Sequence, residues 1–169
     1  PPPPPAAATD VVVRARQDAV AGANAQFRFV VNGVDISTVH EVTATSSFED
    51  ISFGIDTAVS GITKFGIRFI NDSYSAGPPV LDRNLYIDRV SLASVAYLST
   101  IAVQYDATTG QTITGANAGS MYNNGLLEWT IGGTTTPPPP TTGTPYVLSR
   151  SSNFLTWNGA VTKLWGVNF

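Results

Sequence analysis

The 169-residue chain contains no cysteine and few charged residues. Without cysteine there is no disulfide framework, no thiolate nucleophile and no zinc site built on sulfur. Charged residues make up 12% of the chain, about half of the roughly 25% that is usual in globular domains. The formal net charge is −3 and the 9 lysines and arginines are scattered, so no basic stripe is available for a nucleic acid.

Long hydrophobic runs are also lacking. No apolar segment approaches the roughly 20 residues that cross a bilayer, so we expect no membrane partner. Hydrophobic residues nonetheless make up 43% of the chain, which is enough to form a core in a domain of this size. With abundant Thr and Ser, 15 Gly and 12 Pro, the composition is typical of a secreted, extracellular or cell-surface β-protein.

Two proline-rich tracts divide the chain. PPPPPAAA opens an N-terminal arm at residues 1–9, and TTTPPPPTTGT forms a linker at 134–144. Proline fixes φ and has no amide proton, so both tracts favour an extended polyproline II conformation. We therefore expect a body at 10–133 and a C-terminal strand block at 145–169. Such Thr/Pro-rich tracts are candidates for O-glycosylation, here at Thr135, Thr136, Thr141 and Thr142.

Within the body, hydrophobic residues alternate with polar ones, which is the two-residue period of strands with one buried face. The clearest runs are centred on Val13, Phe29 and Ile67, and turn signals such as Asn32-Gly33 separate them. Further strands are expected near residues 39–45, 48–56, 84–92, 96–105, 111–115 and 125–131. With roughly eight to ten short strands and no helical period, the body is predicted to be an all-β, jelly-roll-like β-sandwich.

The C-terminal block is an appendage of apolar strands that is too short to bury them. Its last strand, 161–169, places Val161, Trp165, Val167 and Phe169 on one face. Because isolated hairpins are marginal in water, the block must dock on a body, either its own or that of a neighbouring subunit by strand addition. A head-to-tail exchange of this kind generates a filament. The favoured hypothesis is an extracellular, glycosylated filament subunit whose partners are copies of itself.

Four segments of the body resemble a known family of sugar-binding modules. They are VVVRAR at 11–16, FRFVVNGV at 27–34, FIND at 69–72 and DRNLYIDRV at 82–90. Over about residues 11–92 the chain resembles the calcium-dependent, xylan-binding carbohydrate-binding modules of families thirty-six and sixty.

The resemblance implies a calcium ion, held in loops at the rim of the sandwich, that itself binds vicinal hydroxyls of a polysaccharide. Transferred by position, its ligands would be Asp72, Asp82 and Asn84, with help from the Arg83 carbonyl. Calcium takes about six to eight oxygen ligands from such groups. The structural alternative is that Asp72 and Asp82 cap turns and that Asp88 pairs with an arginine. The second hypothesis is therefore a non-catalytic, calcium-dependent module that recognises xylan-like polysaccharide.

Other residues of the body suggest contacts with sugar. Exposed aromatic rings can stack on pyranose rings, and Tyr74 and Tyr122 lie in loops rich in Gly, Ser and Asn. Trp129 alternates with apolar neighbours and is expected in the core. Asn71-Asp72-Ser73 is an N-glycosylation sequon, so Asn71 is a candidate for an attached glycan.

The sequence carries no pattern of a catalytic site, and we expect no enzyme. Its one histidine, His40, lies in an alternating strand, with no nucleophile elbow and no Gly-rich phosphate loop. A pair of carboxylates could hydrolyse a glycoside, but acidic residues on β-strands ordinarily form a solvated face. The carboxylates considered for such a pair are Glu41, Glu49, Asp50 and Asp56.

Overall fold

The computed structural model describes residues 9–18, 22–77, 79, 81–131, 148–151, 154–157 and 160–162. The chain divides into two units, Pro1–Gly133 and Thr134–Phe169. Each unit is described by itself below.

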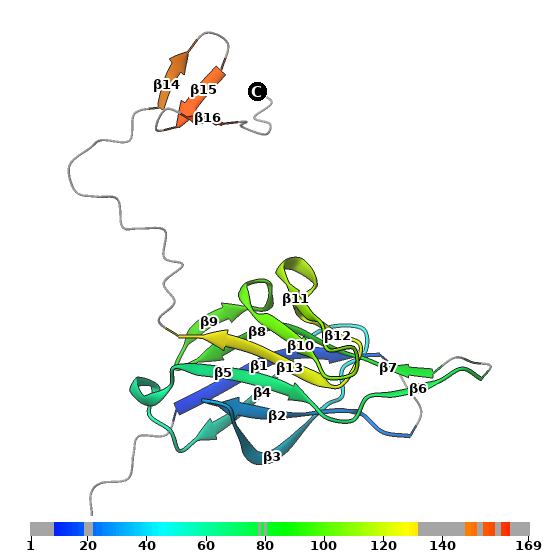
Figure 1. Cartoon of the computed structure of the whole chain (residues 1–169). Helices are drawn as coiled ribbons and strands as arrows, with labels where there is room; N and C mark the ends of the chain where they lie inside the picture. The colour runs from blue at the N-terminus through cyan, green and yellow to red at the C-terminus, as the bar shows by residue number, and fades with distance from the viewer. Residues whose placement is uncertain are drawn as a thin grey trace, which may run out of the picture. The chain divides into compact units, whose positions relative to one another are not determined.

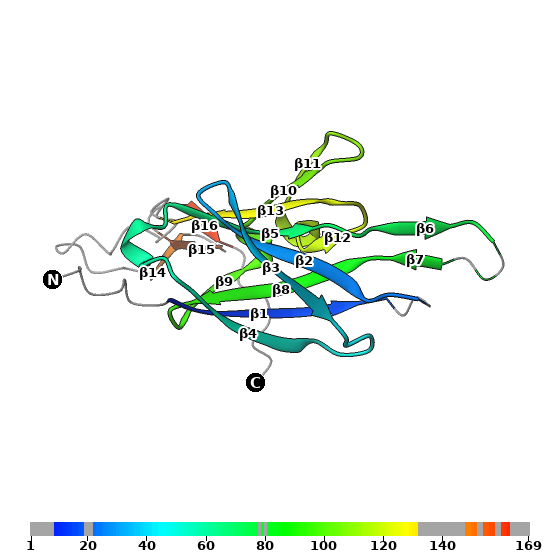
Figure 2. The same cartoon turned by 90° about the horizontal axis from the view of Figure 1, so that it is seen from below.

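The first unit is a sandwich of two antiparallel sheets (Figures 1 and 2). The five-stranded sheet has the order β12-β8-β1-β4, with β9 also paired to β8. Its strands are β1 (Thr9–Gln17), β4 (Glu49–Ile55), β8 (Leu85–Leu92), β9 (Val95–Leu98) and β12 (Ser120–Met121). The six-stranded sheet has the order β11-β10-β13-β5-β2-β3. Its strands are β2 (Ala25–Val31), β3 (Val34–Val42), β5 (Lys64–Phe69), β10 (Val103–Asp106), β11 (Thr112–Thr114) and β13 (Gly125–Thr130). The predicted all-β sandwich is confirmed.

A separate hairpin joins the two sheets. Its strands are β6 (Ser73–Ser75) and β7 (Leu81–Arg83). Strand β5 of one sheet leads into β6, and β7 leads into β8 of the other sheet, so the hairpin projects from one end of the sandwich (Figure 2). Polar residues that flank this hairpin are therefore collected at that end.

The remaining connections of the first unit contain short 3-10 helices. They are η1 (Val59–Gly61), η2 (Ser99–Ile101) and η3 (Gly115–Asn117). Among the described residues, no helix has the length and hydrophobicity needed to span a membrane.

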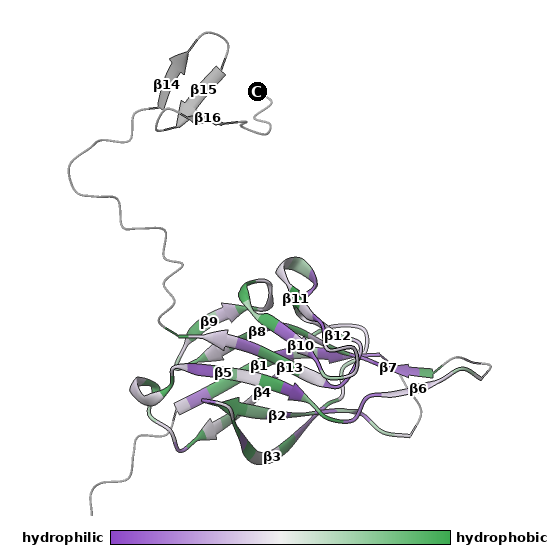
Figure 3. Ribbon diagram, in the orientation of Figure 1, coloured by the Kyte–Doolittle hydropathy of each residue, from purple (hydrophilic) through white to green (hydrophobic). Residues whose placement is uncertain are grey.

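Burial follows the alternation of the sequence. Every odd residue of β1 from Thr9 to Gln17 is buried, whereas the even ones face outward, and alternating colours along the strands of Figure 3 show the same pattern. At the centre of the core, the Trp129 ring stacks on Phe65 with 5.2 Å between ring centroids, and its Nε1 donates to the Leu98 carbonyl at 2.9 Å. The predicted core position of Trp129 is confirmed.

One predicted strand, 96–105, is two strands in the structure. The segment forms β9, then η2, then β10, because β9 pairs in the five-stranded sheet and β10 in the six-stranded one. The chain must turn to cross between sheets, and η2 supplies that turn. The turn predicted at Asn32-Gly33 is confirmed, since both residues have positive φ, 50° and 85°, as a tight two-residue hairpin turn requires.

The second unit contains a three-stranded antiparallel sheet, β14-β15-β16. Its strands are β14 (Leu148–Ser151), β15 (Phe154–Trp157) and β16 (Ala160–Thr162). Val161, the first residue of the predicted polymerisation face, pairs with Thr156 within this sheet. The other residues of that face and the linker threonines lie outside the described residues: Trp165, Val167, Phe169, Thr135, Thr136, Thr141 and Thr142.

Candidate functional site

The calcium ligands implied by the resemblance lie at the base of the β6–β7 hairpin. The hairpin pairs Tyr74 with Asp82. Facing residues of an antiparallel pair project to the same side, and the side alternates along each strand. Extending the register by two residues places Asp72 opposite Asn84, on the same side as Asp82. The loop that separates Asp72 from Asp82 in the sequence thus folds back and brings the two carboxylates together, and the Asp82 charge acts on Asp72.

Two oxygen atoms at this point are buried and have no hydrogen-bond partner among the described residues. They are Oδ1 of Asp72 and Oδ1 of Asn84. The Asn84 amide is held by its nitrogen, which donates to Oδ2 of Asp18 at 2.7 Å and to Oδ2 of Asp82 at 3.1 Å. A buried acceptor without a partner costs about 1–3 kcal/mol. Because carboxylate and amide oxygens are ligands that calcium prefers, the residues present fit the ion that the resemblance implies.

The charges around Asp72 also favour a cation. Burial raises the pKa of the Asp72 carboxyl above its ordinary value, and the neighbouring charges of Asp82 and Asp106 raise it further. A hydrogen bond from the Ser73 amide and the charge of Arg83 act in the opposite direction without cancelling the rise. The ionised form of Asp72 is therefore disfavoured in the folded protein, and a bound cation would supply the missing positive charge.

Carboxylates alone do not form a metal site here. Among the residues that the structure describes, no three His, Cys, Asp or Glu side chains are grouped closely enough to hold a metal ion. A calcium ion at this position would therefore need amide and carbonyl oxygens as well, such as Oδ1 of Asn84 and the carbonyl expected of Arg83.

The Arg83 side chain points away from the Asp72 side of the hairpin and anchors it. Its Nε donates to the Ala23 carbonyl at 3.0 Å and its Nη1 donates to the Asn71 carbonyl at 2.6 Å. The guanidinium, a cation with no acceptor atom, thus anchors the backbone, and the role that the resemblance implies concerns the Arg83 carbonyl.

The side chain of Asn71, the sequon asparagine, is already engaged. Its Oδ1 accepts from the Gln26 amide at 2.7 Å, and its Nδ2 donates to the Asn24 carbonyl at 2.8 Å. An N-linked glycan would be attached at Nδ2, the same atom that donates to Asn24, and would replace one of its two hydrogens. In the folded protein Asn71 acts as a link between β2 and the start of the hairpin.

The loop between β12 and β13, which carries Tyr122, also holds Asp72 in place. Oδ1 of Asn124 accepts from the Asp72 amide at 2.8 Å. The adjacent Asn123 donates to Oδ2 of Asp106 at 2.8 Å. Burial raises the pKa of Asp106, but hydrogen bonds from the Thr109 amide, the Asn123 side chain and the Thr108 amide outweigh this and leave the pKa lowered. The sequence indicated Tyr122 in this loop but not Asn123 or Asn124, because an Asn-Gly pair is typical of any turn.

Asp18 is a further residue of the site that the sequence did not indicate. It follows β1 directly, and its Oδ2 accepts from both Asn84 Nδ2 and the Tyr86 hydroxyl, the latter at 2.9 Å. The Arg16 guanidinium lies 3.9 Å from the centre of the Tyr86 ring. Burial and the hydrogen bond to Asp18 raise the pKa of Tyr86 to about 12. Asp18 thus orients the Asn84 amide and holds the Tyr86 side chain through its hydroxyl.

Both tyrosines proposed for sugar contact are exposed. Tyr74, in β6, is 66% exposed and Tyr122, directly after β12, is 53% exposed. Strand β12 pairs Met121 with Leu85, the first residue of β8. The next residue of the loop, Tyr122, therefore lies beside Asn84, which directly precedes β8. The Tyr122 ring meets Tyr86 edge to face, with centroids 6.2 Å apart. One aromatic ring is therefore available directly beside the candidate ion site.

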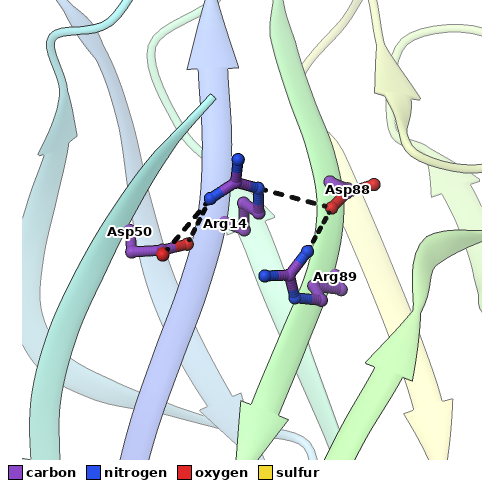
Figure 4. A network of polar contacts seen from close by, with 4 residues as sticks. All are labelled: Arg14, Asp50, Asp88 and Arg89. Carbon is purple, nitrogen blue, oxygen red and sulfur yellow. Dashed lines mark hydrogen bonds and ion pairs between the residues drawn. The ribbon is translucent and has the colours of Figure 1, made fainter. Parts of the chain in front are cut away.

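The structural interpretation of Asp88 is confirmed. A bulge between β1 and β8 leaves Asp88 next to Arg14, and its Oδ2 lies 2.8 Å from Arg89 Nη1 and 3.6 Å from Arg14 Nε (Figure 4). Arg14 also contacts Asp50 at 3.1 Å. The network joins β4, β1 and β8 on the outward face of the five-stranded sheet, away from the hairpin.

Two of the residues considered for catalysis, His40 and Glu49, have structural partners. His40 stacks on Phe53, with centroids 3.9 Å apart, and burial lowers its pKa. Burial raises the pKa of Glu49, but hydrogen bonds from Ala44 and Thr43 outweigh it and leave the pKa lowered. These contacts give each of the two side chains a role in packing or in hydrogen bonding.

Comparison with known proteins connects this geometry to a family. A family model described as a Ca-dependent, xylan-binding carbohydrate-binding module, CBM60, matches residues 10–114. The fold is similar to solved structures of vCBM60. A complex with galactobiose has a TM-score of 0.50 at 16% identity and covers 72% of this chain and 97% of that one. A selenomethionine form has a TM-score of 0.49 at 17% identity and covers 72% of this chain and 90% of that one. No curated protein matches the chain.

The family match overturns the hypothesis of a filament subunit. It covers most of the body, whereas the filament argument depended on the ends of the chain, namely the proline tracts and the apolar C-terminal block. The body forms both sheets of its sandwich from residues 9–130. The described strands of the C-terminal block pair with one another in a three-stranded sheet. The chain belongs to the calcium-dependent, xylan-binding carbohydrate-binding module family CBM60.

Proposed function

We propose that this chain is a non-catalytic, secreted module that binds xylan-like polysaccharide through a calcium ion at the base of the β6–β7 hairpin. The ligands would be Asp72, Asp82 and Asn84, with the Arg83 carbonyl. The observation that carries this proposal is the pair of buried oxygens without partners, Oδ1 of Asp72 and Oδ1 of Asn84. Both belong to the residues that the family resemblance selects.

The fold supplies the two sides of this site from different sheets. Asp72 follows β5 of the six-stranded sheet, and Asn84 precedes β8 of the five-stranded one. Asn124 holds the Asp72 backbone and Asp18 holds the Asn84 side-chain amide, so the Asp72 backbone and the Asn84 oxygen are positioned before a ligand arrives. A bound calcium would supply open coordination positions for two adjacent sugar hydroxyls. Such preorganisation reduces the entropy cost of binding.

The exposed rings of Tyr122 and Tyr74 would add apolar contact. A pyranose ring presents C–H groups on its faces, and an aromatic ring beside the ion can cover one of them. Tyr122 is the better placed of the two, because Tyr86 supports it from the side. Tyr74 lies two residue pairs further out along the hairpin than Asp72 and Asn84, opposite Asp82.

Calorimetric titration with xylan oligosaccharides tests the proposal. We expect binding in calcium, loss of binding with a chelator, and affinity at least about tenfold weaker in Asp82→Ala. Asp35→Asn is the matched control, since Asp35 is a half-buried carboxylate of β3 that pairs with Arg68 of β5 at 2.8 Å, within the six-stranded sheet. Galactobiose, the ligand in one similar structure, tests how specific the site is for xylose units. Binding that ignores both chelator and Asp82→Ala would refute the proposal.

A further inference from the structure

The outward face of the five-stranded sheet carries a hollow far from the hairpin. It has a volume of about 530 Å³, within the roughly 300–1,000 Å³ typical of ligand sites. Residues from β1, β4, and β8 with its following turn line it, among them Asp10, Val12, Ser52, Gly54, Ser91 and Ser94.

The hollow follows from a row of small residues beside a row of long ones. Val12 faces Ser52 on one side and Ser91 on the other. The next outward residue of β1 is Arg14, whose ion pairs with Asp50 and Asp88 form a ridge across the strands (Figure 4). Small side chains next to this ridge leave a trough that crosses three strands. We call it the serine trough, lined by the six residues named above.

The lining matches the chemistry of a sugar chain. Three serine hydroxyls can each donate and accept hydrogen bonds, and the Asp10 carboxylate accepts them. Val12 provides an apolar surface between these polar groups. A pyranose has the matching arrangement, with hydroxyls at its edge and C–H groups on its faces. A phosphate ligand does not fit, because Asp10 is acidic and the nearby Arg14 is already shared by two carboxylates.

The serine trough and the Asn84 side of the candidate ion site lie along the same outward face of the five-stranded sheet, where Asn84 is in register with the outward Tyr86 of β8. Val12, Arg16 and Asp18 share the outward register of β1. Val12 and Asp18 are six residues apart, which corresponds to roughly 20 Å along a strand. A disaccharide held at the ion cannot cover this distance, whereas a longer chain can.

We propose that the serine trough is a second contact site for the polysaccharide, and that a chain held at the ion site extends along β1 to reach it. This inference rests on the proposed function and adds to it the course of the polysaccharide along β1. It predicts that affinity grows with chain length beyond the disaccharide, because distant units gain hydrogen bonds in the trough.

The test compares a disaccharide and a long oligosaccharide of xylose in calcium. Ser52→Trp fills the trough from the exposed side of β4. Thr130→Trp is the matched control on the outward face of the other sheet, where Thr130 is also exposed. We expect Ser52→Trp to weaken the long oligosaccharide by about tenfold, the equivalent of one or two hydrogen bonds, and to leave disaccharide binding unchanged.

A spectroscopic arm uses the unaltered protein, so that it does not depend on the fold of a variant. Amide resonances of Ser52, Ser91 and Ser94 should shift with the long oligosaccharide and not with the disaccharide. Equal affinity for the two lengths, or unshifted trough resonances at saturation, would overturn the second contact and leave calcium-dependent disaccharide binding standing. Disaccharide binding that survives a chelator would instead overturn the proposed function, and the trough path with it.

Discussion

Replacing Asp72 by asparagine should make the protein more stable without calcium and less stable with it. The folded protein disfavours the ionised Asp72, because burial and the charges of Asp82 and Asp106 raise its pKa. Asparagine has nearly the same shape and carries no charge. Relief of the repulsion should therefore stabilise the calcium-free variant by up to about 1 kcal/mol, the scale of interactions between partly exposed charges.

Calcium should reverse the order of the two proteins. At a concentration one hundred times its dissociation constant, a ligand stabilises the folded state by about 2.7 kcal/mol. For a body of this size, 1 kcal/mol corresponds to about 3–5 °C in Tm. The unaltered protein should therefore gain roughly 10 °C in calcium. Asp72→Asn, which lacks a charged ligand, should gain much less.

Differential scanning fluorimetry in chelator and in calcium measures both effects. Asp35→Asn serves as the control, because it removes a carboxylate of the same kind that pairs with Arg68 between β3 and β5. A variant that melts below the unaltered protein in chelator would refute the electrostatic argument. A variant that gains as much from calcium as the unaltered protein would refute the role of Asp72 as a ligand.

The same reasoning gives a pH dependence. The folded-state pKa of Asp72 is raised, so in chelator its contribution to stability is present below the ordinary carboxyl pKa and is lost as the pH rises through the raised value. In calcium the proton competes with the ion, so the gain in Tm on adding calcium should grow from pH 4 to pH 7, taken as about the range of carboxyl titration. A gain that is constant over this range would contradict Asp72 as a ligand.

Three further predictions concern the surroundings of the site and the core. Asp18→Asn should lower the pKa of Tyr86 from about 12 toward 10, visible as earlier phenolate absorbance in an alkaline titration; an unchanged curve would exclude the bond between them. Trp129→Phe should cost about 2–3 kcal/mol in urea unfolding through a cavity and the lost bond to Leu98, and a loss below about 1 kcal/mol would show that the ring is not tightly packed. Gly119→Ala should lower the free energy of unfolding by about 3 kcal/mol, because the added Cβ would collide with the backbone of β8. An unchanged free energy of unfolding would show that Gly119 is not packed tightly against β8.

The sequence predicted the sandwich because alternation is a local property. Burial of alternate residues in β1 and the turn at Asn32-Gly33 follow from side-chain period and backbone preference. The break of 96–105 into β9 and β10 could not be predicted in this way. It depends on which sheet each half joins, and that is decided by pairing with strands far away in the sequence.

The candidate site was predictable only in part for the same reason. Asp72, Asp82 and Asn84 stood out through their resemblance to a motif. Asp18 and Asn124 carry no such signal. They belong to the site because the residue after β1 and the loop before β13 lie beside the base of the β6–β7 hairpin in the folded chain. The C-terminal block misled the prediction of function, because an apolar strand pattern shows that a segment needs pairing and does not show with what.

Anomalous diffraction from crystals grown in calcium tests the central claim most directly. The account predicts a peak about 2.3–2.6 Å from Oδ1 of both Asp72 and Asn84, the usual calcium–oxygen distance. It also predicts that the peak disappears in Asp72→Asn. A fully occupied calcium elsewhere on the sandwich, with these two oxygens turned toward protein donors, would contradict the account.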